Sequence, residues 1–273
     1  MIDKVKKIIP IKLGHSVKKA LLFIRGMYYK GNNYYCPICG GYFRKFLPGG
    51  FDLPVIKEMQ ITGAGYRQNN VCPRCLSTDR DRLVYLYLKE RTDFFSVLLK
   101  VLHIAPEPSL YKIFKKLDNI EYIAGTKYQE GFYYSEKLIK LDITSLPFNN
   151  DYFDLIIANH ILEHIEDDRL AMKELYRVLK IGGQAILQVP ISLKLNKTYE
   201  NPTVKSKTER EKHFGQFDHI RLYGKDYPKR LEEVGFQVEK LKPGTEKWPL
   251  NEITKYGLNK NEYLYVAHKV KAI

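Results

Sequence analysis

The sequence lacks long apolar runs and several familiar signatures. None of its apolar segments approaches the roughly 18 residues that cross a bilayer, which excludes a transmembrane segment. The longest apolar stretch of the N-terminal arm, residues 20–24, is shorter than a signal-peptide core and lacks a small-residue cleavage site. No G-x-G-x-x-G motif follows an expected strand, which argues against a nicotinamide-binding fold. We therefore expect a cytoplasmic protein.

The composition indicates a globular chain. Apolar residues make up 44% of the 273 positions and charged residues 28%, with 13 Phe and 21 Tyr, so the chain can bury a core and is not of disordered or collagen-like type. The length exceeds one minimal domain and falls short of two full ones. It predicts one domain of catalytic size with a smaller accessory module.

The N-terminal arm, residues 1–31, carries half of the net charge. It holds eight Lys and Arg against one Asp, and the whole chain has a net charge of +14. Apolar residues interleave with the lysines, as in a basic amphipathic segment that contacts an anionic membrane from its inner face. A solvated, frayed terminus is the alternative interpretation.

All four cysteines lie in two CxxC pairs, Cys36 with Cys39 and Cys72 with Cys75. In a reducing compartment this spacing predicts four thiolate ligands for one Zn²⁺, and two disulfides or free thiols are the alternative. Four protein ligands leave no open position for a substrate, so we expect a structural site within a small module at residues 32–78. Arginines surround the cysteines, which keeps RNA binding open.

Beyond residue 79, short apolar strands alternate with amphipathic helices, which predicts a parallel sheet with helical crossovers. The expected strands are 100–105, 121–124, 138–141, 153–158, 184–189, 236–241 and 263–268, and the expected helices are 79–90, 108–117, 167–179 and 225–234. The 167–179 helix begins with acidic residues, and Gly182 and Gly183 are expected to end it. We expect a Rossmann-like, doubly wound, seven-stranded α/β domain at residues 79–273.

Residues 142–190, DITSLPFNNDYFDLIIANHILEHIEDDRLAMKELYRVLKIGGQAILQVP, carry a recognisable progression of motifs. Their order and spacing closely resemble the class I S-adenosylmethionine-dependent methyltransferases of type 11, and the resemblance extends over about residues 95–241. The later segments FGQFDHIRLYG and VGFQV are similar to those of bacterial members that carry a CPxCG…CPRC front end. The resemblance implies S-adenosylmethionine as the cofactor.

The resemblance also implies positions that contact this cofactor. Asp142 follows the third strand, where the family places an acid that accepts a hydrogen bond from the adenine amino group, and Ile143 would pack on the ring. Asn159 follows the fourth strand and would face the methionine part and the transferring methyl group.

The loop after the first strand departs from the family. His103, Ala105 and Glu107 occupy positions that normally read acid-x-Gly-x-Gly, and the loop contains no glycine. The acid that grips the ribose hydroxyls after the second strand is also missing from residues 124–127. Glu107 or Glu130 could substitute for it.

Histidine and acidic residues near the expected site are candidates for catalysis. Transfer to a hydroxyl requires removal of its proton, and histidine can do this near neutral pH. His219 is our expected general base, oriented by Asp218 or Glu163, with Arg221 holding the acceptor. His164 is a further candidate, although it could serve only the helix entry.

A second interpretation assigns a divalent metal ion to the same region. His160, Glu163 and His164 are spaced to converge on one face of a helical turn, with His213 or His219 as a fourth ligand. Small-RNA 2′-O-methyltransferases and some quinone-pathway O-methyltransferases have a similar Glu-x-x-Glu-His core, in which His160 here replaces the first Glu.

Three functions remain open. A sugar, glycan or other small hydroxyl acceptor fits the membrane-directed arm and the resemblance to bacterial chains, many of which look associated with surface polysaccharides. RNA methylation fits the net charge and the zinc module. A scaffold that has lost its cofactor is the third possibility, since a fold does not guarantee a function. The sequence leaves the oligomeric state undetermined.

Overall fold

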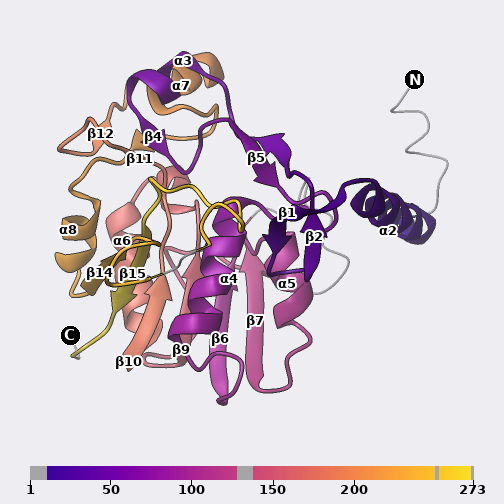
Figure 1. The fold of residues 1–273 in the computed structure, drawn as a ribbon. Coiled ribbons are helices and arrows are strands. Elements are labelled where there is room, and N and C mark those ends of the chain that lie inside the picture. The colour runs from indigo at the N-terminus through magenta and orange to yellow at the C-terminus, as the bar shows by residue number, and fades with distance from the viewer. Residues whose placement is uncertain (1–10, 128–137, 250–251, 272–273) are drawn as a thin grey trace.

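The computed structural model describes residues 11–127, 138–249 and 252–271 and is built around one seven-stranded sheet (Figure 1). Its strands are β6 (Leu99–Ile104), β7 (Ile120–Thr126), β8 (Ile139–Lys140), β9 (Phe153–Ala158), β10 (Leu179–Ile186), β14 (Gln237–Leu241) and β15 (Leu264–His268). They follow the order β14-β15-β10-β9-β6-β7-β8, and β15 is antiparallel to both of its neighbours. The seven expected strands and the doubly wound sheet are confirmed.

Strand β9 occupies the centre of this sheet because its residues are apolar on both faces. Five of its six residues are buried, the near-continuous apolar run of a strand that is covered on both sides. Val101 of β6 and Leu155 of β9 lie side by side, and Ile156 pairs with Ala185 of β10. Because β6, β7 and β9 are parallel, the loops that follow Ile104, Thr126 and Ala158 meet at one edge of the sheet.

Helices cover both faces of the sheet. The described helices are α2 (Ile11–Tyr28), α3 (Pro54–Glu58), α4 (Asp79–Arg91), α5 (Pro108–Phe114), α6 (Asp168–Val178), α7 (Lys207–Phe214), α8 (Tyr227–Glu232) and the 3₁₀-helix η1 (Leu162–His164). Helices α6 and α8 contribute to one core cluster, with Leu102 and Ile156 of the sheet. Helices α4 and α5 pack with Val101 and Leu155 on the opposite face.

Helix α6 begins and ends close to the residues that its local sequence predicts. The Asp167 side chain accepts a hydrogen bond from the Leu170 backbone amide at 2.8 Å, so the acidic start is confirmed. The helix ends at Val178, and Leu179 already pairs with Phe153 as the first residue of β10. The expected helix 167–179 is therefore confirmed to within one residue at each end, and strand β10 begins at Leu179, before the two glycines, because this residue pairs with β9.

The N-terminal module consists of short elements that join the large domain. Its strands are β1 (Lys30–Cys36), β2 (Gly41–Phe43), β3 (Leu47–Gly49), β4 (Ile61–Thr62) and β5 (Arg67–Val71), and the large domain adds the short strands β11 (Ile191–Ser192), β12 (Tyr199–Glu200) and β13 (Arg221–Leu222). Strand β4 pairs with β11. Ile56 and Ile61 share a small core with Phe214 and Leu222. A boundary near residue 78 stays a prediction, although these contacts join the two parts closely.

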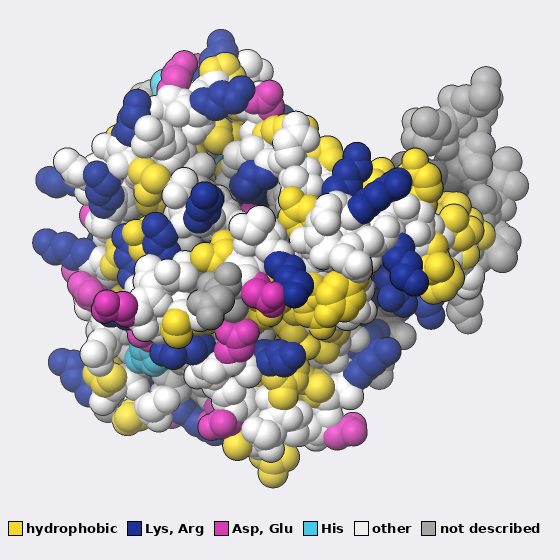
Figure 2. All heavy atoms as spheres, in the orientation of Figure 1, with side chains coloured by type: hydrophobic (Ala, Val, Ile, Leu, Met, Phe, Trp, Pro, Cys, Tyr) yellow, Lys and Arg dark blue, Asp and Glu magenta, His cyan; other side chains and the backbone are white. Residues whose placement is uncertain are grey.

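Helix α2 projects from the module (Figure 1). It is anchored where Arg25 Nε donates to the Pro73 carbonyl at 2.7 Å. Leu21, Phe23 and Ile24 are each more than half exposed, and Figure 2 shows apolar and basic side chains gathered on this helix. Among the described residues, no helix is both long and apolar enough to cross a bilayer.

Candidate active site

The four cysteines lie together in the N-terminal module as free thiols. The Sγ atoms of Cys36 and Cys75 are 3.6 Å apart, and those of Cys39 and Cys72 are 3.7 Å apart. All four sulfurs lie within 4.8 Å of one another. A disulfide needs an S–S distance of about 2.05 Å, whereas four thiolates about 2.3 Å from one Zn²⁺ are roughly 3.8 Å apart. The four side chains could therefore bind one zinc ion, and the spacing does not fit disulfides.

The turn after β6 reaches a glycine-like conformation without glycine. Ala105 has a φ of +45°, in the left-handed region that favours glycine. Its amide donates to the Gly125 carbonyl at 2.7 Å, which fixes the turn against the end of β7. The turn therefore keeps the sharp reversal that the missing glycines would provide, at the cost of backbone strain at Ala105.

A hydrogen-bonded network surrounds Glu107 just beyond this turn. His103 Nε2 lies 2.9 Å from one carboxylate oxygen, and Asn159 Nδ2 donates to the other at 3.0 Å. His103 Nδ1 lies 2.8 Å from the Tyr122 hydroxyl. Burial by itself would raise the pKa of Glu107, but the bonds from His103 and Asn159 outweigh it and lower the pKa. The network places an ionised carboxylate between the ends of β6 and β9.

Asn159 offers a further polar atom at this edge. Its Oδ1 is buried and has no hydrogen-bond partner among the described residues. A buried amide oxygen without a donor is unfavourable unless a ligand or water supplies one. This atom can accept a hydrogen bond from a bound cofactor.

Asp142 lies at the end of β8, beside the expected adenine position. Its carboxylate accepts hydrogen bonds from the Thr144 amide and hydroxyl and lies 2.8 Å from Lys127 Nζ. Lys127 first, and then Thr144, lower the pKa of Asp142 to about 2. Ile143 is buried in the main core. Glu130, the other expected substitute for the ribose-binding acid, lies outside the described residues.

Glu163, His164 and His219 converge close to this edge. His164 Nε2 lies 4.0 Å and His219 Nε2 lies 3.9 Å from the same Glu163 Oε1. The two imidazole rings meet edge to face, with centroids 4.7 Å apart. Burial by itself would raise the pKa of Glu163, but His160 and the neighbouring histidines lower it to about 2. Burial also lowers the pKa of His219. The sequence prediction that Glu163 lies beside His219 agrees with this arrangement.

Arg221 is buried and fully engaged within the chain. Its guanidinium donates to the carbonyls of Leu162, Ile165 and Glu166 and pairs with Glu200 at 2.7 Å. These contacts hold the η1 turn that carries Glu163. The geometry therefore favours a positioning role for Arg221 over the expected contact with the acceptor.

The other two histidines of the metal interpretation are not part of the group of three converging side chains, although His160 contacts Glu163. His160 Nδ1 lies 3.2 Å from Glu163 Oε1, but His160 is not part of the group whose ligand atoms all lie within 4.8 Å. His213 is exposed, with Nδ1 3.3 Å from the Tyr199 hydroxyl. The structure brings His219 to Glu163 and His164 instead.

Glu262 is a buried acid near the site that the sequence analysis does not name. It is 5% exposed, and burial, followed by the charge of Asp79, raises its pKa to about 7. A Cβ added to Gly63 would lie 3.5 Å from Glu262 Oε1 and 3.7 Å from His160 Nε2. The N-terminal module thus covers this part of the sheet edge. Glu262 precedes β15 without any local motif, so no sequence signal indicates its burial.

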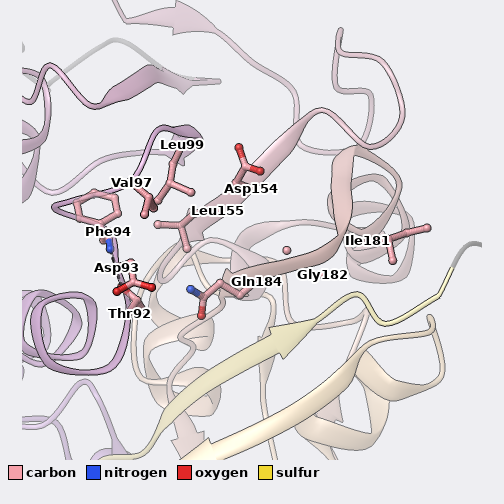
Figure 3. A pocket seen from close by; sticks show the side chains of 11 residues that line it. Thr92, Asp93, Phe94, Val97, Leu99, Asp154, Leu155, Ile181, Gly182 and Gln184 are labelled. Carbon is pink, nitrogen blue, oxygen red and sulfur yellow. Dashed lines mark hydrogen bonds between the residues drawn. The ribbon is translucent and has the colours of Figure 1, made fainter.

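A cavity of about 320 Å³ lies at the opposite edge of the sheet (Figure 3). It is lined by the beginnings of β6 and β9, including Leu99 and Asp154, and by Gly182 and Gln184 of β10. Ligands of open α/β sheets bind beyond the carboxyl ends of the strands. This cavity is therefore separate from the candidate active site.

Comparison with known proteins identifies the large domain. Residues 97–187 match the family model described as a methyltransferase domain. This part of the chain is therefore similar to methyltransferase domains. The matched segment runs from the start of β6 to just beyond β10, so it contains the turn at Ala105, Asn159 and Glu163.

The similar curated proteins match only parts of the chain. A chloroplastic 2-methyl-6-phytyl-1,4-hydroquinone methyltransferase of Arabidopsis thaliana is 40% identical over 55 residues, 20% of this chain and 16% of the relative. An uncharacterized protein of Methanocaldococcus jannaschii is 33% identical over 93 residues, 34% of this chain and 42% of the relative. The chain thus spans less than half the length of either relative.

Similarity to solved structures is accompanied by low sequence identity. A SAM-dependent methyltransferase from Archaeoglobus fulgidus is 19% identical and has a TM-score of 0.43, over 70% of this chain and 94% of that structure.

Proposed function

We propose that this chain is an S-adenosylmethionine-dependent methyltransferase whose acceptor is a small molecule with an ionisable hydroxyl, such as a sugar or glycan. The proposal is carried by two groups of side chains at the carboxyl edge of the sheet. One is the Glu107–Asn159 network, and the other is the pair Glu163 and His219. The Glu107–Asn159 network supplies polar groups for a cofactor, and Glu163 and His219 supply groups that can activate a hydroxyl.

The residues present fit the cofactor in three respects. The left-handed turn at Ala105 preserves the backbone reversal next to the cofactor position. The ionised Glu107 and the unpartnered Oδ1 of Asn159 are suited to the methionine ammonium group. The Asp142 carboxylate is suited to the adenine amino group. When bound, S-adenosylmethionine supplies a methyl group on a sulfonium, which is open to in-line attack by an oxygen.

His219 is the proposed general base. Its Nδ1 lies 3.3 Å from the Phe214 carbonyl and would donate to it, which leaves Nε2 free to take a proton on the side of Glu163. The Glu163 carboxylate would then stabilise the imidazolium. Arg221 contributes by holding the turn that positions Glu163.

The site of methylation on the acceptor can be oxygen or a neighbouring carbon. The names of curated relatives include quinone-pathway C-methyltransferases, one of which, from Xanthomonas oryzae, is 40% identical over 47 residues, 17% of this chain and 19% of the relative. Ionisation of a hydroxyl on an aromatic ring also activates the adjacent ring carbon, so one base serves both outcomes. Analysis of products from a panel of glycans, hydroquinones and RNA by mass spectrometry would separate these acceptors.

Cofactor binding tests the proposal before the acceptor is known. Calorimetric titration of the full chain should show one S-adenosylmethionine per chain, and Glu107→Gln should weaken binding at least tenfold, about 1.4 kcal/mol. Glu232→Gln, an exposed control on α8, should bind like the wild type. Absence of binding at millimolar cofactor would support the scaffold alternative and end the catalytic proposal.

The four cysteines are proposed to hold a structural Zn²⁺. The sulfur spacing supports this, as does Arg82, which is fully buried and donates to the carbonyl of Ser77, two residues after Cys75. All four ligand positions come from the protein, so the ion would stabilise the module without taking part in methyl transfer.

The arm is proposed to contact an anionic membrane surface through helix α2. The exposed Leu21 and Ile24, together with the basic charge of the arm, support this proposal. In a flotation assay the full chain should rise with vesicles that contain phosphatidylglycerol and less with pure phosphatidylcholine. Leu21→Glu should abolish flotation. Steep salt-dependent retention of RNA, lost with arginine substitutions near the cysteines, would favour RNA as the partner.

A further inference from the structure

Glu163 has a carboxylate that is buried among histidine side chains without a well-aligned hydrogen bond. Its side chain is 1% exposed, and neither oxygen accepts a well-aligned hydrogen bond from the described residues. Even His160, whose Nδ1 lies 3.2 Å from Oε1, lacks this alignment. A buried carboxylate is strongly unfavourable unless it is paired, hydrogen-bonded or bound to a metal. A bound cation would be a partner for this carboxylate in addition to the neighbouring histidines.

His164 and His219 present the same ring atom to this carboxylate. Their Nε2 atoms lie 4.0 and 3.9 Å from Glu163 Oε1, which is beyond hydrogen-bond distance. The three ligand atoms lie within 4.8 Å of one another. Ligands about 2.0–2.2 Å from a shared ion are roughly 3–3.6 Å apart, so side-chain rotations of about half an ångström would bring these atoms around one ion.

The opposite nitrogen of each ring is already occupied. His219 Nδ1 lies 3.3 Å from the Phe214 carbonyl, and His164 Nδ1 lies 3.2 Å from the Asp218 carbonyl. A carbonyl only accepts, so each Nδ1 carries a hydrogen, and in its neutral form each ring turns a lone pair at Nε2 toward Glu163. Metal-binding histidines typically have this arrangement, in which a backbone carbonyl fixes the tautomer and the ring orientation.

Three lone-pair donors therefore face one another without a hydrogen between them. We propose that Glu163, His164 and His219 bind one divalent transition-metal ion, of the Mn²⁺, Fe²⁺ or Zn²⁺ class. Two imidazoles and one carboxylate suit these ions, and they leave coordination positions open. This set keeps Glu163, His164 and His219 from the set that the sequence suggests and leaves out His160 and His213.

The ion would sit where the acceptor hydroxyl is activated, and in this respect the inference rests on the proposed function. An acceptor oxygen bound at an open position would lose its proton more readily. The oxygen then forms a bond to the methyl carbon as the bond from sulfur to that carbon breaks, and the sulfur leaves as a neutral thioether. The proton goes to solvent. With the ion bound, His219 would act as a ligand, and the ion would activate the hydroxyl in place of the base role that His219 has in the ion-free chain.

Mn²⁺ is the probe that separates this site from the cysteines, because thiolates prefer Zn²⁺ and bind Mn²⁺ weakly. The zinc-loaded full chain, without cofactor or acceptor, is titrated with Mn²⁺ by calorimetry and electron paramagnetic resonance. We expect one Mn²⁺ per chain. His164→Ala and His219→Ala should each weaken binding at least tenfold, whereas His213→Ala, a matched exposed control, should not change it.

Two further measurements keep the outcome clear. His164 is partly exposed, so His164→Ala should fold even if His219→Ala does not, and circular dichroism checks both. Absence of Mn²⁺ binding, or binding that His164→Ala leaves unchanged, would overturn the inference. Cofactor binding without Mn²⁺ binding would overturn the metal site alone, whereas Mn²⁺ binding without cofactor binding would support the site and overturn the proposed methyl transfer.

Discussion

The seven-stranded sheet and the N-terminal module are held together in different ways. Two large core clusters cover the faces of the sheet, and β9 lies between them with nearly every side chain buried. The module has a small core around Phe43, Phe46 and two cysteines, and its strands are no longer than seven residues. The sheet is stabilised by apolar burial, whereas the module has a small core, and the proposed zinc ion would contribute much of its stability. Loss of a single contact should therefore affect the module more.

Removal of a zinc ligand should have the largest effect. Cys36→Ser takes away one of the four thiolates, so zinc content should fall from about one per chain to near zero. Because structural zinc contributes directly to folding, the module should lose on the order of 5 kcal/mol of stability. Mass spectrometry of the metal and thermal unfolding would measure both. Lys45→Ser, exposed between the two cysteine pairs, is the control. Retained zinc in Cys36→Ser would refute the four-thiolate site.

Arg82 tests the junction of the two regions. Its fully buried guanidinium donates to the carbonyls of Ser77, Asn70, Tyr256 and Gly257. Arg82→Met leaves these carbonyls without donors, and we expect a loss of about 3–5 kcal/mol in the free energy of unfolding. Urea unfolding would measure it.

Lys89→Met, at an exposed position of the same helix α4, should change stability by less than about 0.5 kcal/mol. Equal effects of the two substitutions would show that the junction contributes little, and that the two regions are more independent than the contacts indicate.

Glu262 should make the stability of the junction depend on pH. Its pKa rises from an ordinary value of 4.5 to about 7 in the folded chain. Between these values the folded state holds more protons than the unfolded state, so stability falls as the pH rises. The wild type should lose about 3 kcal/mol from this group across that window. Glu262→Gln should lack this decline in urea unfolding from pH 5 to 8, whereas Glu232→Gln should keep it. If the free energy of unfolding changed with pH in the same way for the wild type and Glu262→Gln, the prediction would be contradicted.

The smallest change in stability is expected for a substitution in the sheet domain, at Ala105. Its left-handed φ costs about 1 kcal/mol for a residue with a Cβ, and part of that is offset by the greater freedom of glycine in the unfolded chain. Ala105→Gly should therefore stabilise the domain by about 0.5 kcal/mol in urea unfolding. A clear loss of stability would show that contacts of the alanine methyl outweigh the strain.

The strands could be predicted from the sequence, but the distances between side chains of the candidate site could not. Apolar periodicity locates β9 because a buried parallel strand needs a continuous apolar run, and the CxxC pairs indicate their own metal chemistry. Strand β10 begins at Leu179, five residues before the expected start at 184, because pairing of Leu179 with Phe153 is a tertiary contact that no local pattern indicates. Glu262 was missed since its burial depends on Gly63, which is about 200 positions away in the sequence.

Local order along the chain was thus enough to specify the sheet, the four thiolates and the methyltransferase motifs, because each depends on residues close together in the sequence. Tertiary structure decided that His219, rather than His160, completes the group with Glu163 and His164, and that Arg221 supports the turn. It also decided that Ala105 adopts the conformation of the missing glycine. These outcomes depend on how separate loops meet at one edge of a sheet, and such meetings are set by packing of the whole chain.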